Sequence, residues 1–176
     1  MNEFELKILD FIREHLACPF LDAVMPVITS LANGGIIWII AAILLLVFKK
    51  TRKTGFSVAL ALIIGLIIGN LILKNLVGRI RPYDLNADVE LLVSRLSDYS
   101  FPSGHTLASF ETASVLMIRD KKLGIPSLIL ATLIAFSRLY LYVHYPTDVL
   151  AGIILGVLIG FISCKAVDLI YKRYEN

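Results

Sequence analysis

The chain has 176 residues, of which 57% are hydrophobic and 18% are charged. Soluble domains contain about 45–50% apolar and about 25% charged residues, so this composition excludes an ordinary soluble globule and a disordered chain. A helix needs about 20 residues to cross a bilayer, and six crossings would use about 120. The sequence therefore predicts an all-α, polytopic membrane helix bundle in which residues 1–176 form a single domain. The net charge of +3 indicates no nucleic-acid partner, because the basic residues separate apolar segments instead of forming a stripe.

The predicted elements begin with an amphipathic helix over residues 3–16, which is typical of a helix lying in the membrane interface. Six apolar segments follow, over residues 16–31, 36–48, 55–73, 104–118, 125–142 and 149–170. The first two are separated by Asn33, Gly34 and Gly35 and are shorter than two full crossings, which indicates a short or kinked pair. We expect six transmembrane helices, with five as the alternative.

The basic residues predict the orientation of the bundle. In a six-crossing arrangement, those near both termini, those of residues 49–53 and those of residues 119–122 share one side. The positive-inside rule makes that side cytoplasmic, with both termini, and predicts a multi-pass protein of the cell (plasma) membrane. Five other cations lie at the opposite, extracytoplasmic ends of the third and fifth segments: Lys74, Arg79, Arg81, Arg95 and Arg138. Cations where the rule predicts few indicate a local anionic partner.

Lys74 and Arg81 end the third apolar segment, just before Pro82. Seven residues make nearly two helical turns, so both cations share one face if the helix continues to Arg81. Lys74 alone could equally be a side chain that reaches the lipid headgroups from a helix end.

The tetrapeptide Pro102-Ser103-Gly104-His105 precedes the fourth apolar segment. Ser103 is suited to be an N-cap, and Gly104 lets a ligand approach backbone N–H groups at the positive end of the helix dipole. A serine and a glycine before a helix are by themselves more often only a cap. With His105 in the first turn, the same residues can form an anion site.

Arg138, His144 and Asp148 connect the fifth and sixth segments. A charge such as Arg138 inside an apolar segment is costly unless it is paired or faces a wet cavity. Pro146 is suited to begin the last helix, which places Asp148 in its first turn and within reach of His144. Taken singly, Asp148 could be only a dipole partner and His144 only an interfacial aromatic residue.

These three groups share one membrane face, and together they allow phosphoryl transfer. Lys74, Arg81 and Arg138, with N–H groups near Ser103 and Gly104, can hold phosphate oxygens. A neutral imidazole is a nucleophile and a protonated one is a general acid, so His144, oriented by Asp148, can attack phosphorus while His105 protonates the leaving oxygen. Sequence order alone leaves open which histidine takes which part. The carboxylates lack metal-ligand spacing, so we expect no metal and no other cofactor.

The three motifs together are similar to the signature of the type 2 phosphatidic acid phosphatase family, which includes bacterial membrane lipid phosphatases and soluble vanadium haloperoxidases. The matching residues are Lys74, Arg81 and Pro82, then Pro102 to His105, then Ser137, Arg138, His144 and Asp148. The resemblance implies a metal-independent phosphatase that forms a phosphohistidine on His144, supported by Asp148, with His105 as acid and base. It also implies that Lys74, Arg81, Ser103, Gly104 and Arg138 hold the phosphate.

A site at the outer interface suits a lipid phosphate that enters from the bilayer. The small size of the chain resembles bacterial undecaprenyl diphosphatases that recycle the cell-wall carrier, so undecaprenyl diphosphate is the first expectation. Phosphatidylglycerophosphate and phosphatidate are alternatives, and a small transporter is the non-enzyme alternative. Residues 83–100 are expected to be either a short interfacial helix near the lipid entrance or a connector. No sequence feature indicates an oligomeric state.

Overall fold

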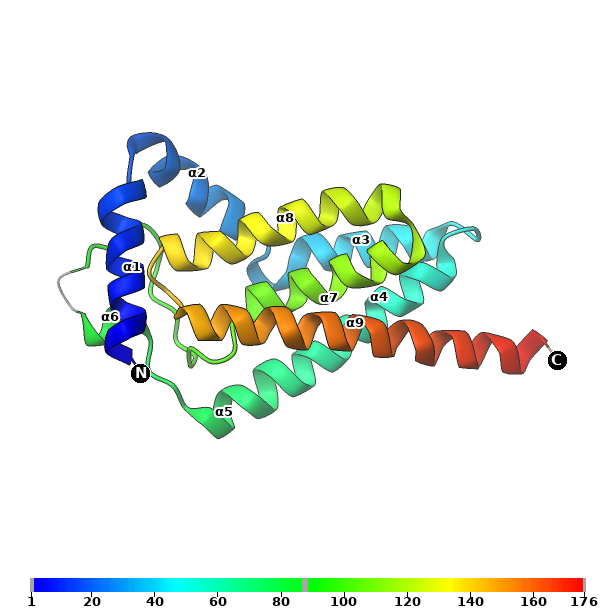
Figure 1. Cartoon of the computed structure of the whole chain (residues 1–176). Helices are drawn as coiled ribbons and strands as arrows, with labels where there is room; N and C mark the ends of the chain where they lie inside the picture. The colour runs from blue at the N-terminus through cyan, green and yellow to red at the C-terminus, as the bar shows by residue number, and fades with distance from the viewer. Residues whose placement is uncertain (1, 87–88, 176) are drawn as a thin grey trace.

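The computed structural model describes residues 2–86 and 89–175, and these residues form helices and connections without a strand (Figure 1). The α-helices are α1 (Asn2–Leu16), α2 (Pro19–Ser30), α3 (Ile36–Val47), α4 (Arg52–Gly65), α5 (Lys74–Val77), α6 (Pro82–Leu85), α7 (Gly104–Arg119), α8 (Lys121–Tyr140) and α9 (Pro146–Glu175). A 3-10 turn, η1 (Asn33–Gly35), precedes α3, and a π-helical stretch, η2 (Leu66–Leu73), joins α4 to α5. The all-α prediction is confirmed.

The described residues contain three helices that are long and apolar enough to cross a membrane, or four if a bent pair counts as one crossing. The first is the helical stretch that begins at Arg52, and the other two are α8 and α9. Helix α7 has only 16 residues, but most of its side chains are buried and it runs inside the bundle. A polytopic membrane bundle is therefore confirmed, whereas the count of six crossings is not.

The count differs because α2 and α3 form one bent path. They meet at 44°, and Gly34 and Gly35 between them have φ values of 59° and 72°. Glycine adopts such left-handed conformations without steric cost, so the chain bends here and then continues in the same general direction. The predicted break is present, but it kinks one path instead of reversing the chain between two crossings.

Helix α1 lies across the end of the bundle at which α5 and α6 are found, and the C-terminus lies at the opposite end (Figure 1). Tyr142, in the turn before α9, donates a hydrogen bond to Asp10 of α1 at 2.7 Å, and Arg13 donates to the Glu90 carbonyl at 3.0 Å. The expectation that both termini share one side therefore differs from the structure. An interfacial helix carries the same sequence pattern on either surface, so its basic residues did not define its side.

Helix α7 packs closely against α9 because glycines of α9 face it. A Cβ atom at Gly156 would lie 2.8 Å from the Glu111 nitrogen, and one at Gly160 would lie 2.8 Å from the Glu111 carbonyl oxygen. Less than two turns from the start of α9, a Cβ at Gly152 would lie 3.0 Å from the Ser103 carbonyl oxygen. Small residues at a spacing of four let helix backbones approach closely, and here they bring the N-terminal ends of α7 and α9 together.

The helix of the third apolar segment does not continue to Arg81. Helix α5 stops at Val77 because Gly78 adopts a φ of 59°, and Arg81 is extended before Pro82. Lys74 and Arg81 therefore do not share a helix face. Helix α6 provides one turn, and residues 86 and 89–100 form no further helix, so the described part of this region is mainly a connector.

Candidate active site

His144 and Asp148 face each other where α9 begins. His144 lies in the turn before Pro146, and Asp148 lies in the first turn of α9. The His144 Nδ1 atom is 3.5 Å from Asp148 Oδ2, and the same oxygen accepts hydrogen bonds from Ser100 Oγ at 2.5 Å and from the Tyr145 N–H at 2.9 Å. Both side chains are buried. The structure thus brings together the predicted imidazole and carboxylate.

The other imidazole nitrogen of His144 faces Arg81. Arg81 Nη1 is 3.3 Å from His144 Nε2, and a guanidinium can only donate, so Nε2 carries the lone pair and Nδ1 carries the proton toward Asp148. Burial, and then the charges of Arg138, Arg81, Lys74 and His105, lower the pKa of His144 well below 6.5. The imidazole is therefore neutral at neutral pH, with Nε2 in the form that a nucleophile needs.

Lys74 and Arg81 converge on one carboxylate of the connector, that of Asp98. Lys74 Nζ pairs with Asp98 Oδ2, and Arg81 Nη2 donates to Asp98 Oδ1 at 2.6 Å. Burial would raise the pKa of Asp98, but its hydrogen bond and ion pair with Lys74 and its contacts with Arg81 outweigh burial and lower the pKa to about 2. Arg81 also donates to the carbonyl oxygens of Asp98 at 2.8 Å and Val143 at 2.7 Å. Lys74 and Arg81, which were predicted to bind phosphate, therefore both bind the Asp98 carboxylate in this structure.

Arg138 keeps unused donors beside this cluster. Its Nη1 donates to Thr29 Oγ1 of α2 at 2.5 Å, while Nε and Nη2 are buried and have no hydrogen-bond partner within the described part of the chain. A buried guanidinium with unpaired N–H groups is costly unless an anion satisfies it. Its charge also lowers the pKa of His144, so Arg138 lies close to the predicted nucleophile.

Ser103, Gly104 and His105 form the start of α7, as predicted, but with different contacts. Ser103 precedes the helix, yet its side chain does not cap it: Ser103 Oγ accepts from Thr106 Oγ1 at 2.9 Å. The Ser103 N–H donates to the Asp148 carbonyl at 3.1 Å, so it is not free to bind an anion as expected. This bond ties the start of α7 to the start of α9.

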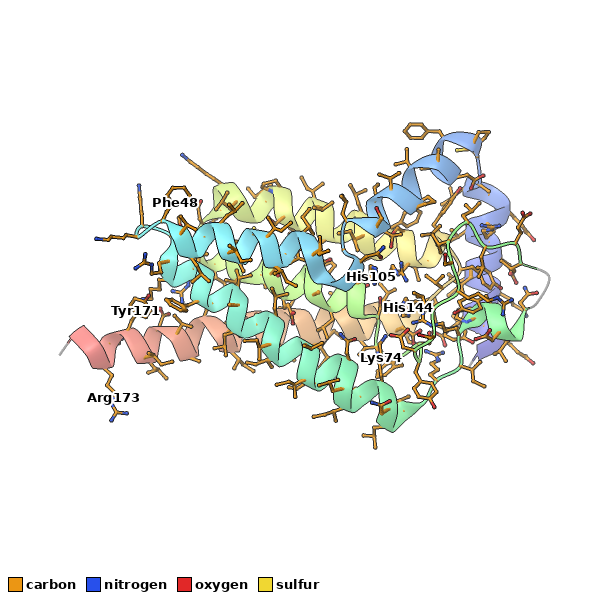
Figure 2. The ribbon with its side chains drawn as sticks, turned by 180° about the vertical axis from the view of Figure 1, so that it is seen from behind. Phe48, Lys74, His105, His144, Tyr171 and Arg173 are labelled. Atoms are coloured by element: carbon orange, nitrogen blue, oxygen red, sulfur yellow. The ribbon has the colours of Figure 1, made fainter. Side chains whose placement is uncertain are left out.

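His105 makes a contact that the sequence did not predict. Its Nε2 atom lies 2.9 Å from Asn33 Oδ1 in η1. A carbonyl oxygen can only accept, so Nε2 carries a proton and Nδ1 is the basic nitrogen. In Figure 2, His105, His144 and Lys74 lie toward one end of the bundle, whereas Phe48, Tyr171 and Arg173 lie at the other.

A cavity of about 500 Å³ leads from this cluster along α7, between α3 and α4. Its polar end includes Lys74, Asp98 and His105, and the rest of its wall is mostly apolar. Four wall residues are also exposed on the outside of the bundle: Ile39, Ile43, Ile63 and Leu66. The cavity therefore borders the surface that would face lipid, and it can accept an apolar chain whose charged end lies at the cations.

The structure adds residues that motif reasoning did not assign to the site. Arg79 pairs with Asp148, Ser100 donates to the same carboxylate, Asn33 binds His105 and Asp98 bridges two cations. Only Arg79 gave a signal, as one of the cations gathered at the outer side. The others are short polar side chains in connections, whose positions depend on the path of the chain.

The sequence of the chain is similar to those of known proteins. The model of the PAP2 superfamily matches residues 52–171. An undecaprenyl-diphosphatase of Sulfolobus acidocaldarius is 38% identical over 130 residues, which are 73% of this chain and 63% of that protein. The undecaprenyl-diphosphatase BcrC of Bacillus subtilis is 32% identical over 162 residues, which are 88% of this chain and 83% of BcrC.

A solved structure of a transmembrane phosphatase has a similar fold. The crystal structure of a transmembrane PAP2-type phosphatidylglycerolphosphate phosphatase from Bacillus subtilis superposes with a TM-score of 0.76 at 28% identity. The match covers 98% of this chain and 88% of that one. The family model, which spans more than half of the chain and includes all three predicted motifs, shows that this protein belongs to the PAP2 superfamily.

Proposed function

We propose that the protein is a membrane lipid phosphatase that acts through a phosphohistidine on His144. One observation carries this proposal: a neutral, buried imidazole directs Nδ1 to Asp148 and its lone-pair nitrogen to Arg81, beside a cation cluster that opens into an apolar cavity. The nucleophile, the anion site and the lipid site are thus adjacent. The family of the chain supports the same reaction class.

In the proposed reaction, His144 Nε2 forms a bond to phosphorus as the phosphorus bond to the leaving oxygen breaks. Burial and the charges of Arg138, Lys74 and Arg81 lower the pKa of His105 to about 3. The negative charge of the bound phosphate offsets these cations, so that protonated His105 gives its proton to the leaving oxygen. Asp148 stabilises the positive charge that develops on the His144 imidazole. Water then attacks phosphorus, His105 takes a proton from it, and the N–P bond breaks to release inorganic phosphate.

Phosphate oxygens are held by the cations around His144. Lys74, Arg81 and the unpaired N–H groups of Arg138 supply the donors, together with the Ser103 hydroxyl and the backbone N–H of Gly104. A bound phosphate competes with Asp98 for the first two cations. No metal takes part in these steps.

The first substrate that we propose is undecaprenyl diphosphate, converted to undecaprenyl phosphate and phosphate. Two relatives bear the name of that activity, and the apolar cavity suits a long hydrocarbon chain. Phosphatidylglycerophosphate or phosphatidate is the second candidate, favoured by the name of the structural neighbour. We disfavour a transporter because the charges gather at one end of the bundle, whereas transporter sites lie near the bilayer midplane.

We also propose that the site faces the extracytoplasmic side of the plasma membrane. The basic clusters at residues 49–53, 119–122 and 172–173 lie at or next to the helix ends opposite the site. The positive-inside rule makes that opposite end cytoplasmic.

The test uses purified protein in detergent with a panel of lipid phosphates. We expect phosphate release that persists with a metal chelator, is blocked by vanadate and is abolished in His144→Ala. The control is His15→Ala, an exposed histidine of α1. A trapped phosphoenzyme should be stable in alkali, labile in mild acid and missing in His144→Ala. Metal-dependent turnover, or full activity in His144→Ala, would overturn the mechanism, and the highest kcat/KM in the panel decides the substrate class.

A further inference from the structure

Arg79 lies behind Asp148, on the opposite side of the carboxylate from His144. Its Nη1 atom donates to Asp148 Oδ1 at 2.5 Å and to Thr147 Oγ1 at 2.7 Å, and Nη2 pairs with Glu5 Oε2 of α1 at 2.5 Å. The guanidinium carbon lies 3.8 Å from the centre of the Tyr145 ring. Arg79 is therefore held from several directions, and its orientation is defined by the fold.

The two oxygens of Asp148 have separate partners. Oδ2 faces His144 and accepts from Ser100 Oγ and the Tyr145 N–H, whereas Oδ1 pairs with Arg79. A carboxylate bound on both oxygens cannot rotate without breaking a charge-assisted hydrogen bond. The Arg79 carbonyl also accepts the Ser100 N–H at 2.8 Å, so the same residue locates a second group that contacts Oδ2.

We infer that Arg79 is a positioning residue that orients Asp148 toward His144, and that Glu5 of α1 anchors Arg79. The inference rests on the proposed function, because the carboxylate that Arg79 holds is the one that supports the proposed nucleophile. Arg79 does not touch the reacting atoms in this scheme. Its contribution is the placement of Asp148.

Glu5 connects this network to the N-terminal helix, which lies outside the stretch matched by the family model. The Glu5 side chain is buried, and its Oε1 accepts from the Thr147 N–H at 3.0 Å and from Thr147 Oγ1 at 2.6 Å. Helix α1 is thus tied to the first turn of α9 at the residue next to Asp148. The interfacial helix acts as an anchor of the site.

Charge balance predicts how the variants behave. Arg79 compensates two buried carboxylates, so Arg79→Gln leaves Asp148 and Glu5 facing each other without that cation. A buried charge without its partner destabilises the fold strongly. The second substitution Glu5→Gln removes one of the two carboxylates and retains an oxygen that can accept from Thr147. The double variant should therefore regain thermal stability without regaining the cation that orients Asp148.

The experiment compares Arg79→Gln, Arg79→Lys, Glu5→Gln and the double variant Arg79→Gln/Glu5→Gln by kcat, KM and Tm in detergent. We expect Arg79→Gln to lower kcat by about tenfold to a hundredfold, as misplacement of a catalytic group does, with KM within about twofold. The loss should appear in kcat and not in KM, because Arg79 orients Asp148 and does not touch the phosphate. Arg79→Lys, which restores a cation at this position, should recover part of kcat. Glu5→Gln should lower kcat less than about threefold, because Arg79 remains on Asp148.

The matched control is Arg95→Gln. Arg95 is also an arginine of the outer face, with an acidic partner, Asp84, at 3.2 Å and a tyrosine ring, that of Tyr83, at 5.3 Å, but its side chain is 62% exposed. It should leave kcat and KM unchanged.

Three results would overturn the inference: an unchanged kcat in Arg79→Gln, an equal loss in Glu5→Gln, or a double variant that recovers kcat together with Tm. The last two would show that Arg79 only anchors α1 or only stabilises the fold. A failure of the proposed function is distinguishable, because it appears in the unmodified protein as missing phosphatase activity or a missing phosphohistidine.

Discussion

Substitution of Gly152 by alanine should lower turnover by separating the two helix ends that form the site. A Cβ at this position would lie 3.0 Å from the Ser103 carbonyl oxygen and 3.0 Å from Thr106 Cβ. Ordinary contacts begin at 3.4 Å, so α9 must move from α7 by about 3.4 − 3.0 = 0.4 Å, because a backbone carbonyl of a packed helix cannot turn away. The shift separates Asp148 from Ser103, whose N–H donates to the Asp148 carbonyl.

The size of the effect follows from the geometry. Misplacement by 1 Å costs about a hundredfold in rate, so a 0.4 Å shift should reduce kcat about sixfold. Overpacking of a close helix contact should also cost about 1–3 kcal/mol of stability. The measurements are kcat with a saturating lipid phosphate and Tm in the same detergent.

Gly160→Ala separates these two effects. Its Cβ would lie 2.8 Å from the Glu111 carbonyl oxygen, which is a tighter contact, but it is eight residues, or about 12 Å of helix, farther from the site. It should therefore lower Tm at least as much as Gly152→Ala, with less than about a twofold change in kcat. The reasoning is refuted if Gly152→Ala lowers Tm without lowering kcat, or if both variants lose kcat equally.

Three further predictions concern charge and topology. Asp98→Asn should lower the inhibition constant of vanadate about fivefold, because the Asp98 carboxylate no longer competes with vanadate for Lys74 and Arg81. The magnitude follows from the roughly 1 kcal/mol or less that half-exposed ion pairs contribute. Weaker inhibition by vanadate would contradict this. As the pH falls below about 6.5, the Tm of the ligand-free unmodified protein should fall relative to that of His144→Gln. Burial lowers the pKa of His144 in the folded state, so the unfolded imidazole binds a proton that the folded one does not. A Tm difference that stays constant between pH 7.5 and 5 would contradict this. In a Cys164→Ser background, an impermeant thiol reagent applied to intact cells should label the exposed Cys18 but not Lys122→Cys. The reason is that α1 and the start of α8 lie at opposite ends of the bundle; equal labelling of the two positions would favour the six-crossing arrangement.

The sequence predicted which motif residues come together, because each motif lies at a helix end where its spacing has a direct physical meaning. Because Pro146 begins α9, Asp148 lies in the first turn of that helix, where it reaches back to His144 four residues earlier. Pro102, Ser103 and Gly104 likewise define the start of α7. These local relations do not depend on the number of crossings.

The rest depends on the path of the chain, which composition does not determine. Asn33, Gly34 and Gly35 favour a break, but a break can reverse a chain or only kink it. Asp98 and Arg79 carry charge in a connector and at a helix end, and their partners depend on how residues 78–100 fold over the site. Helix α1 has polar residues that suit either membrane surface, and its tertiary contacts, such as those of Glu5 with Arg79 and Thr147, place it at the site.

The reacting residues and the cavity wall come from different parts of the chain, and this separation has a consequence for specificity. His105, His144 and Asp148 belong to the starts of α7 and α9, which are held together by close glycine packing. The wall of the cavity includes Ile39 and Ile43 of α3, which lies outside the stretch matched by the family model. Substitutions there can change the shape of the lipid site without moving the nucleophile. Lipid preference should therefore vary with α3, through KM, while the pH profile of kcat stays constant because the same imidazoles and Asp148 carry the chemistry.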